Sequence, residues 1–353
     1  MSELKVNSIK GVSASSAAIS INNTDGTCTA NLTNRTNKNL VINGDFRIAQ
    51  RATSSTTSGI ATVDRFGMYH TGVDEAPTQA QGSVTSGGAY DSGFRNCLKV
   101  TNGNQTSGGG SAKYIWIQSL FEAQDIANSG WNYTSTSSFI TVQFWVKSSV
   151  AQNFYGYVRT VDGSNYLYPF ETGSLSANTW TKVTKTIPGN SNLTFDNDTG
   201  HGFQINIFPY LGTGYTGSIS LNTWSAYNSS VRVPDYTATW YTTDDATFEL
   251  TGVQIEVSDH ATSFQFRSYA EELALCQRYY FQNTATLYLC AYGSNAINNM
   301  FFPVEMRATP TVSETTTSGN LTSISQITRL SCYYYTASST GSAGTGIKAN
   351  AEV

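Results

Sequence analysis

Most of the chain is built from short segments in which apolar and polar side chains alternate. From about residue 39 such segments recur, separated by stretches rich in Gly, Asn and Ser. In FITVQFWVK, 139–147, the apolar residues Ile140, Val142, Phe144 and Val146 fall on one face of an extended strand. A period of two predicts strands that are buried on one face. Many such strands joined by turns predict an all-β chain, an antiparallel β-sandwich or jelly roll.

One of these segments changes its phase in the middle. In FELTGVQIEV, 248–257, Phe248 and Leu250 belong to one alternating set, whereas Val253 and Ile255 follow the other. The change falls at Gly252. An extra residue at a glycine is typical of a β-bulge, so we predict a bulge at this position.

The segment SYAEELALCQRYY, 268–280, has helical spacing instead. Ser268 and Glu271 form a capping box, in which each side chain binds an exposed backbone N–H of the other residue. Tyr269, Leu273, Cys276 and Tyr280 make one apolar stripe. We expect a short helix linking two domains, with Cys276 packed in a core rather than acting as a nucleophile.

These patterns divide the chain into four parts. Residues 1–38 form a tether that is too small to build a core. The alternating apolar residues of this tether suit packing on another chain. The β-sandwich covers 39–267, the linking helix 268–282, and a small C-terminal β domain 283–353. The apolar strand content of this last domain is high for its size, so we expect a partner chain to complete it.

Composition narrows the class of protein. Only 12% of the 353 residues are charged, about half the usual 25%. The net charge is −4 with no basic block, which argues against nucleic acid as a partner. We expect no secretory signal and no membrane insertion, because no apolar run approaches the roughly 20 residues of a membrane span. Five widely spaced cysteines without a CxxC pair predict free thiols.

Motifs for catalysis are lacking in the sequence, so we expect a non-enzymatic protein. There is no Walker loop, HExxH or GxSxG, and the three histidines lie far apart. Acidic pairs occur at Asp196 and Asp198 and at Asp244 and Asp245, in turn-like sequence. Three interpretations stay open for them: turn capping, a structural calcium, or the carboxylate pair of a sugar hydrolase.

Aromatic residues in polar loops are the richer signal. Such rings can stack on the apolar face of a sugar while neighbouring Asn, Asp and Thr bind its hydroxyls. The alternative is that they pack beneath their own loops or between subunits. The candidate glycan-binding residues are Tyr210, Tyr215, Trp224, Tyr227, Tyr236 and Trp240.

Several stretches carry a resemblance to a known family. NLVINGDFRIAQR (39–51) with VDRFGMY (63–69), and the segment 248–282, resemble the opening and close of a jelly-roll module in bacteriophage tail-fibre proteins. FFPVEMRATPTV (301–312) is similar to the strand that follows there, and LKVNSIKGV resembles the virion-proximal start of marine phage fibres. The region from about 80 to 240 matches only by pattern.

This resemblance implies a carbohydrate-binding-module-like sandwich in a homotrimer that attaches a virion to host surface glycans. Residues 1–38 would contact other virion tail or capsid proteins, after synthesis in the host cytoplasm. Two alternatives remain: a purely structural connector or decoration protein, and a polysaccharide depolymerase. No cofactor is expected beyond a structural calcium, for which Asp45 and Glu249 are candidate ligands. Arg47 stands where the carbohydrate-binding relatives often have an acidic residue.

The polar residues of these stretches also have plain structural interpretations. Asn43-Gly44 marks a turn or bulge, and Asp45 can pair locally with Arg47. Asp64 and Arg65 can form a surface ion pair that orients a strand end.

Overall fold

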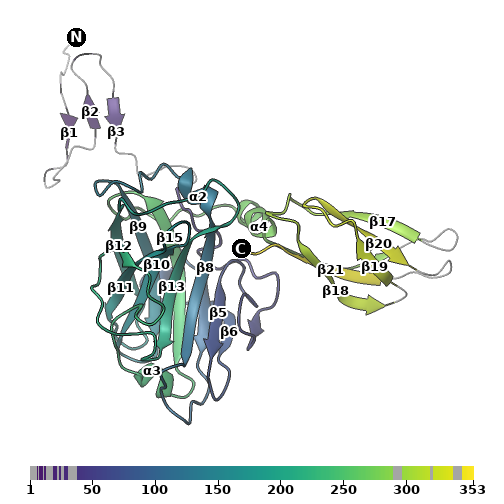
Figure 1. Ribbon diagram of the computed structural model, residues 1–353, viewed down its shortest axis with the longest axis horizontal. Helices are drawn as coiled ribbons and strands as arrows, with labels where there is room; N and C mark the ends of the chain where they lie inside the picture. The colour runs from purple at the N-terminus through teal and green to yellow at the C-terminus, as the bar shows by residue number, and fades with distance from the viewer. Residues whose placement is uncertain are drawn as a thin grey trace.

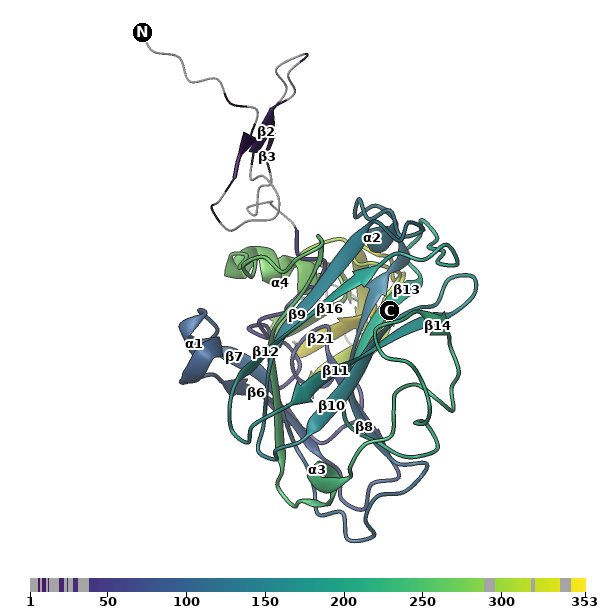
Figure 2. The same ribbon diagram turned by 90° about the vertical axis from the view of Figure 1, so that its left-hand side faces the viewer.

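A computed structural model describes residues 6, 8–10, 12, 19–21, 24, 28–30, 38–288, 296–318, 321–336 and 344–353. Strands dominate these residues and all their strand pairings are antiparallel, which confirms the all-β fold class. Figure 1 shows a large sandwich with a smaller group of strands extending from it, and Figure 2 shows the same chain from the side.

Close to the N-terminus, three short strands form a sheet of their own in the order β1-β2-β3. These strands are β1 (Ser8–Ile9), β2 (Ile19–Ile21) and β3 (Cys28–Ala30). In both views this sheet stands apart from the sandwich. The side chains of Ile9 and Val12 are exposed, at 54% and 107%.

The sandwich consists of two six-stranded sheets. The first sheet has the order β14-β11-β10-β13-β8-β5, and the second has the order β12-β9-β15-β7-β6-β4. The strands of the first sheet are β5 (Gly67–Thr71), β8 (Tyr114–Glu122), β10 (Asn153–Thr160), β11 (Tyr166–Ser174), β13 (His201–Leu211) and β14 (Ser225–Ala226). Those of the second are β4 (Ser54–Ser55), β6 (Thr78–Ser83), β7 (Asn96–Thr101), β9 (Phe139–Ser148), β12 (Thr181–Pro188) and β15 (Thr247–Val257).

The core lies between these two sheets and follows the alternation in the sequence. Val142 and Phe144 of β9 are fully buried in it, as are Phe154 of β10 and Ile255 of β15. The chain passes repeatedly from one sheet to the other, as a jelly roll does. Three short helices occupy its connections: α1 (Gly87–Asp91), α2 (Ala123–Ala127) and α3 (Thr239–Thr242).

The predicted bulge is confirmed in β15. Its pairing with β9 shifts register between Thr251 and Gln254. Gly252 has φ +64, and a Cβ there would lie 2.6 Å from the ring of Phe94. A side chain would therefore meet both backbone strain and a steric clash. The bulge allows the apolar set to stay in the core after the change of phase.

The predicted helix is α4 (Tyr269–Gln277), and both bonds of the capping box are present. Cys276 is fully buried, which confirms core packing, and neither Cys97 nor Cys276 takes part in a disulfide. The helix lies between the sandwich and the C-terminal strands (Figure 1). Within the described part of the chain, no helix combines the length and apolar character needed to cross a membrane.

The C-terminal strands form two three-stranded sheets, β16-β21-β18 and β17-β20-β19. Their bounds are β16 (Tyr280–Tyr288), β17 (Ala296–Phe301), β18 (Thr311–Ser318), β19 (Leu321–Ser325), β20 (Ser331–Thr336) and β21 (Gly344–Asn350). A small cluster of buried side chains, including Met306 and Ile347, holds them together. The domain boundaries given above stay predictions.

Charged residues join this small domain to the sandwich. Arg65 pairs with Glu352 and lies over the ring of Tyr279, at 3.5 Å from its centroid. Arg51 bridges Asp64 and Glu352, at 2.9 and 3.0 Å. The predicted surface pair of Asp64 and Arg65 is therefore wrong: both are buried, and each pairs with a different partner. The local pair of Asp45 and Arg47 is confirmed.

Candidate functional site

The outer face of the first sheet carries two neighbouring cross-strand rows of different chemistry. In one row, Tyr69 of β5 lies opposite Trp116 of β8, and Phe208 of β13 lies opposite Tyr155 of β10. The rings of Trp116 and Phe208 link the two pairs, with centroids 6.3 Å apart. Directly opposite residues in a sheet interact through their side chains, so this row is a continuous aromatic band.

The neighbouring row, which we call the amide row, consists of two amides and one phenol. Gln118, Asn206 and Tyr157 lie opposite one another on β8, β13 and β10. The Oδ1 atom of Asn206 accepts from Gln204 Nε2 at 2.5 Å and from Gln118 Nε2 at 3.5 Å. Asn206 is only 1% exposed, and its Nδ2 has no hydrogen-bond partner among the described residues. A buried donor without a partner is uncommon and costs stability.

A long connection, 212–238, folds back over this face. Its Tyr236 packs edge-on against Tyr155, with centroids 5.2 Å apart. Arg232 lies over Tyr215 and Trp116, at 4.8 and 5.5 Å from their centroids. Such cation–π contacts hold the connection against the sheet.

Partly exposed rings remain around Arg232. Tyr114 stacks on Trp116 with a centroid distance of 3.8 Å, and Tyr215 contacts Tyr114 edge-on. Arg159 lies over Tyr227 at 3.6 Å, and Arg232 is 5.8 Å from the same ring. We call this group the aromatic patch: Tyr69, Tyr114, Trp116, Tyr215 and Tyr227, with Arg232.

Two titratable side chains near this face, His201 and Tyr157, are uncharged at neutral pH. Burial, followed by the nearby charge of Arg159, lowers the pKa of His201 to about 4, so its imidazole is neutral at pH 7. Burial raises the pKa of Tyr157 to about 12 and keeps its hydroxyl protonated. The face therefore combines rings, amides and hydroxyls with the two cations Arg159 and Arg232. Such groups suit a ligand with apolar C–H faces and many hydroxyls.

The six aromatic residues predicted to bind glycan fall into a buried group of three and a group of three on the connection 212–238. Trp240, Tyr210 and Trp224 are core residues rather than exposed platforms, with exposed fractions of 0%, 5% and 9%. Trp240 packs against Phe248, and Tyr210 stacks on Tyr241. These three belong to the packing alternative: Tyr210 lies on β13, Trp240 on α3 and Trp224 next to β14, and all three rings are part of the sandwich core.

The other three lie on the connection over the first sheet. Tyr236 is half-buried against Tyr155, whereas Tyr215 and Tyr227 belong to the aromatic patch. For these three, contact with a glycan stays a prediction.

Three residues of the aromatic patch were missed in the sequence. Tyr69, Tyr114 and Trp116 lie in strands, whereas the sequence pattern predicts platforms only among aromatic residues in polar loops. A usable signal was present in YIWIQSLFE, 114–122, where Ile115 and Ile117 supply the buried face. Large rings at the alternate positions of such a strand must then lie on its outer face.

The two candidate calcium ligands are engaged elsewhere. Asp45 pairs with Arg47, and Glu249 pairs with Lys147 at 2.8 Å. Glu249 also accepts from the thiol of Cys97, at 3.8 Å. No group of three or more metal-ligating side chains occurs among the residues placed by the structure. Each carboxylate therefore already has a cationic partner, although Asp45 Oδ1 is buried without a hydrogen-bond partner among the described residues, and a calcium held by Asp45 and Glu249 stays a prediction.

The acidic turn residues behave in part as turn caps. Asp198 Oδ1 accepts from the backbone N–H of Gly200 at 2.8 Å, which confirms capping there. Asp196 donates its backbone N–H to Asp162 Oδ2. Asp245 has a left-handed backbone with φ 55 in an exposed turn.

Comparisons with known proteins give weak overlaps. No protein-family model and no curated protein matches the chain. Among solved structures, the enzymatically active domain of tailspike protein 4 from bacteriophage CBA120 overlaps with 63% of this chain and 22% of its own, at 10% identity and TM-score 0.33. The chain thus spans about a fifth of that structure's length.

Two carbohydrate-binding domains overlap in the same way. The N-terminal cellulose-binding domain of Cellulomonas fimi β-1,4-glucanase C covers 61% of this chain with 100% of its own, at 12% identity and TM-score 0.30. A family 11 carbohydrate-binding module of a Clostridium thermocellum cellulase covers 59% with 96% of its own, at 11% identity and TM-score 0.27. Overlaps this weak establish neither a family nor a ligand.

Proposed function

We propose that this chain is a non-enzymatic subunit of a phage tail fibre or related appendage that binds a neutral host glycan through the aromatic patch. The observation that carries the proposal is the aromatic patch next to the amide row on one sheet face. A sugar ring can place its apolar face on Trp116 or Tyr215 while Gln118 binds a hydroxyl. The 12% charge content supports a neutral ligand over a highly charged one.

A single open patch of this kind gives weak binding, which several copies would strengthen. We propose a homotrimer, in which three linked sites act together on a repeated surface glycan. Exposed apolar side chains in the C-terminal domain support contact between subunits, since Phe301 is 71% exposed and Leu330 55%. Light scattering that gives only a monomer mass would contradict the homotrimer.

The N-terminal strands support attachment to other virion proteins. Ile9 and Val12 are exposed apolar residues in a part of the chain that stands apart from the sandwich. A partner protein would cover them. This also favours the second candidate function, a structural connector in the tail or capsid. The two differ in whether neighbouring virion proteins cover the aromatic patch, which a density map of the particle would reveal.

Removal of two rings from the connection tests the glycan-binding role. The double variant Tyr215→Ala/Tyr227→Ala should bind host envelope fractions at least about tenfold more weakly than the unchanged protein. The control is Tyr269→Ala, because Tyr269 is 60% exposed but lies on α4. Equal binding by both variants, or no binding of the unchanged protein to any envelope fraction, would refute the role.

A further inference from the structure

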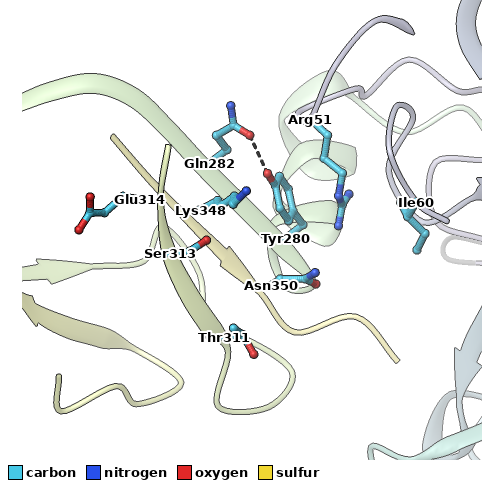
Figure 3. A pocket seen from close by; sticks show the side chains of 9 residues that line it. All are labelled: Arg51, Ile60, Tyr280, Gln282, Thr311, Ser313, Glu314, Lys348 and Asn350. Atoms are coloured by element: carbon cyan, nitrogen blue, oxygen red, sulfur yellow. Dashed lines mark hydrogen bonds between the residues drawn. The ribbon is translucent and has the colours of Figure 1, made fainter. Parts of the chain in front are cut away.

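A cavity of about 620 Å³ lies where the C-terminal strands meet the sandwich (Figure 3). Cavities of roughly 300–1,000 Å³ accommodate small organic ligands. Its lining includes Arg51 and Ile60 from the sandwich and Tyr280 and Gln282 from β16. The remaining lining residues are Thr311, Ser313, Glu314, Lys348 and Asn350. We call it the junction pocket.

The floor of the junction pocket is made of polar side chains in two cross-strand rows. Lys348 of β21 lies opposite Gln282 of β16 and Ser313 of β18. Two residues further along β21, Asn350 lies opposite Tyr280 and Thr311. Opposite residues in antiparallel strands have Cβ atoms about 5 Å apart. Their polar groups are therefore close enough to bind one small molecule together.

Hydrogen bonds orient both amides of the floor. The hydroxyl of Tyr280 donates to Gln282 Oε1 at 2.6 Å, as drawn in Figure 3. The backbone N–H of Glu352 donates to Asn350 Oδ1 at 3.1 Å. Because the two amide oxygens are thus used, Nε2 of Gln282 and Nδ2 of Asn350 are left as donors. With the hydroxyls of Ser313 and Thr311, the floor offers mostly hydrogen-bond donors.

The charges of the pocket differ in how far they are neutralised. Arg51 pairs with Asp64 and Glu352 and stacks on Tyr280, 3.6 Å from the ring centroid. Lys348, in contrast, is exposed and pairs with no carboxylate among the described residues. It is therefore the cation that can attract a ligand. Glu314 adds one acceptor to the lining, and in Figure 3 it lies away from Arg51.

We propose that the junction pocket binds an acidic saccharide, a sugar ring that carries a carboxylate. The carboxylate pairs with Lys348 and accepts from the amide donors of Gln282 and Asn350. Ring hydroxyls bind Ser313 and donate to Glu314, which disfavours anions that have no hydroxyl to offer. This site lies on another sheet than the aromatic patch, and it does not depend on the function proposed for the aromatic patch.

The first test compares three ligands on the full chain by titration calorimetry: glucuronic acid, glucose and acetate. Glucuronate should bind at least about tenfold more tightly than either other ligand, because only it has both a carboxylate and hydroxyls. Glucose that binds as tightly as glucuronate would overturn the role of the carboxylate. Acetate that binds as tightly would show a general anion site and overturn the saccharide assignment.

The second test uses Lys348→Gln, with Lys182→Gln as the matched control. Both lysines are exposed and both variants lose one charge, but Lys182 lies on β12 of the sandwich. Lys348→Gln should weaken glucuronate binding about tenfold and leave the midpoint of thermal unfolding unchanged. Lys182→Gln and Tyr215→Ala/Tyr227→Ala should bind glucuronate normally. An unaffected Lys348→Gln, or equal weakening by both lysine variants, would refute the proposal.

Discussion

The sandwich and the C-terminal domain are both built from antiparallel strands, but different forces hold them in place. The sandwich encloses fully buried rings such as Phe144, Phe154 and Phe203 between two large sheets. In the C-terminal domain, the buried cluster among the described residues is small and includes alanines at 349 and 351. That domain is fixed to the sandwich by Arg51, Arg65 and Glu352. One region is stabilised by its own core and the other largely by its attachment.

The largest effect should come from a cavity in the sandwich core. Phe144→Ala removes a fully buried ring and should lower the free energy of unfolding by about 3–5 kcal/mol. Chemical denaturation followed by tryptophan fluorescence measures this. Ser323→Ala, at an exposed position of β19 in the smaller domain, should change this free energy by less than about 0.5 kcal/mol. Similar losses in the two variants would contradict the distinction.

A smaller and more local effect should come from the junction. Glu352→Gln leaves Arg65 and Arg51 without one counter-charge in a buried place, which costs roughly 3 kcal/mol. Hydrogen exchange should become faster in β16 and β21 and stay unchanged in β9 and β15.

The control for this variant is Glu305→Gln. Glu305 pairs with Arg329 where both side chains are about half exposed, at 54% and 44%. Surface pairs of this kind contribute little, so exchange should stay as in the unchanged protein. Faster exchange throughout the sandwich of Glu352→Gln would show that the junction stabilises more than the small domain.

The smallest effect should be a dependence of the free energy of unfolding on pH, which arises from Asp64 at the contact between the two domains. Burial raises the pKa of Asp64 from 3.8 to about 6, although Arg51 opposes the shift. The folded state therefore holds this proton more tightly than the unfolded chain. Its stabilising contribution is complete below pH 3.8 and is lost as the pH rises through about 6.

The measurement is the free energy of unfolding of the unchanged protein and of Asp64→Asn across a range of pH. The difference between the two proteins reports the contribution of the Asp64 carboxyl. Asparagine resembles the protonated acid and does not titrate. Between the two pKa values, the stability of the unchanged protein should fall relative to the variant as the pH rises. A relative increase in the same window would mean that the ion pair with Arg51 outweighs burial.

Local features of the fold were predictable from the sequence because neighbouring residues determine them. The alternation in 139–147, the glycine at 252 and the pair Ser268 and Glu271 each specify a strand, a bulge or a cap through short-range geometry. The partners of Asp64 and Arg65 were not predictable. Glu352 is almost 300 residues away in the chain, and only the docking of the small domain brings it there.

The candidate site was predictable only in part. The sequence shows many aromatic residues in polar loops, but a position in a loop does not determine whether a ring is accessible to a ligand. Trp240 and Trp224 turn into the core, whereas Trp116 is partly exposed on a strand face. That division depends on how the connection 212–238 folds back over the first sheet, and no local spacing encodes such a contact. Aromatic residues at the outer positions of strands are therefore candidate platforms for a sugar, as aromatic residues in loops are.

The position of β15 also has a consequence for biosynthesis. This strand is the last of the sandwich in the chain, yet it lies between β9 and β7 in the interior of its sheet. The first residues of the sandwich also need β15 as a partner. The backbone N–H of Leu40 donates to the carbonyl of Ile255, and the N–H of Val253 donates to the carbonyl of Gly44. A ribosome adding roughly 5–20 residues per second needs tens of seconds to produce all of them. Throughout that time the nascent chain carries open strand edges, which neighbouring nascent chains can pair with before the sandwich closes.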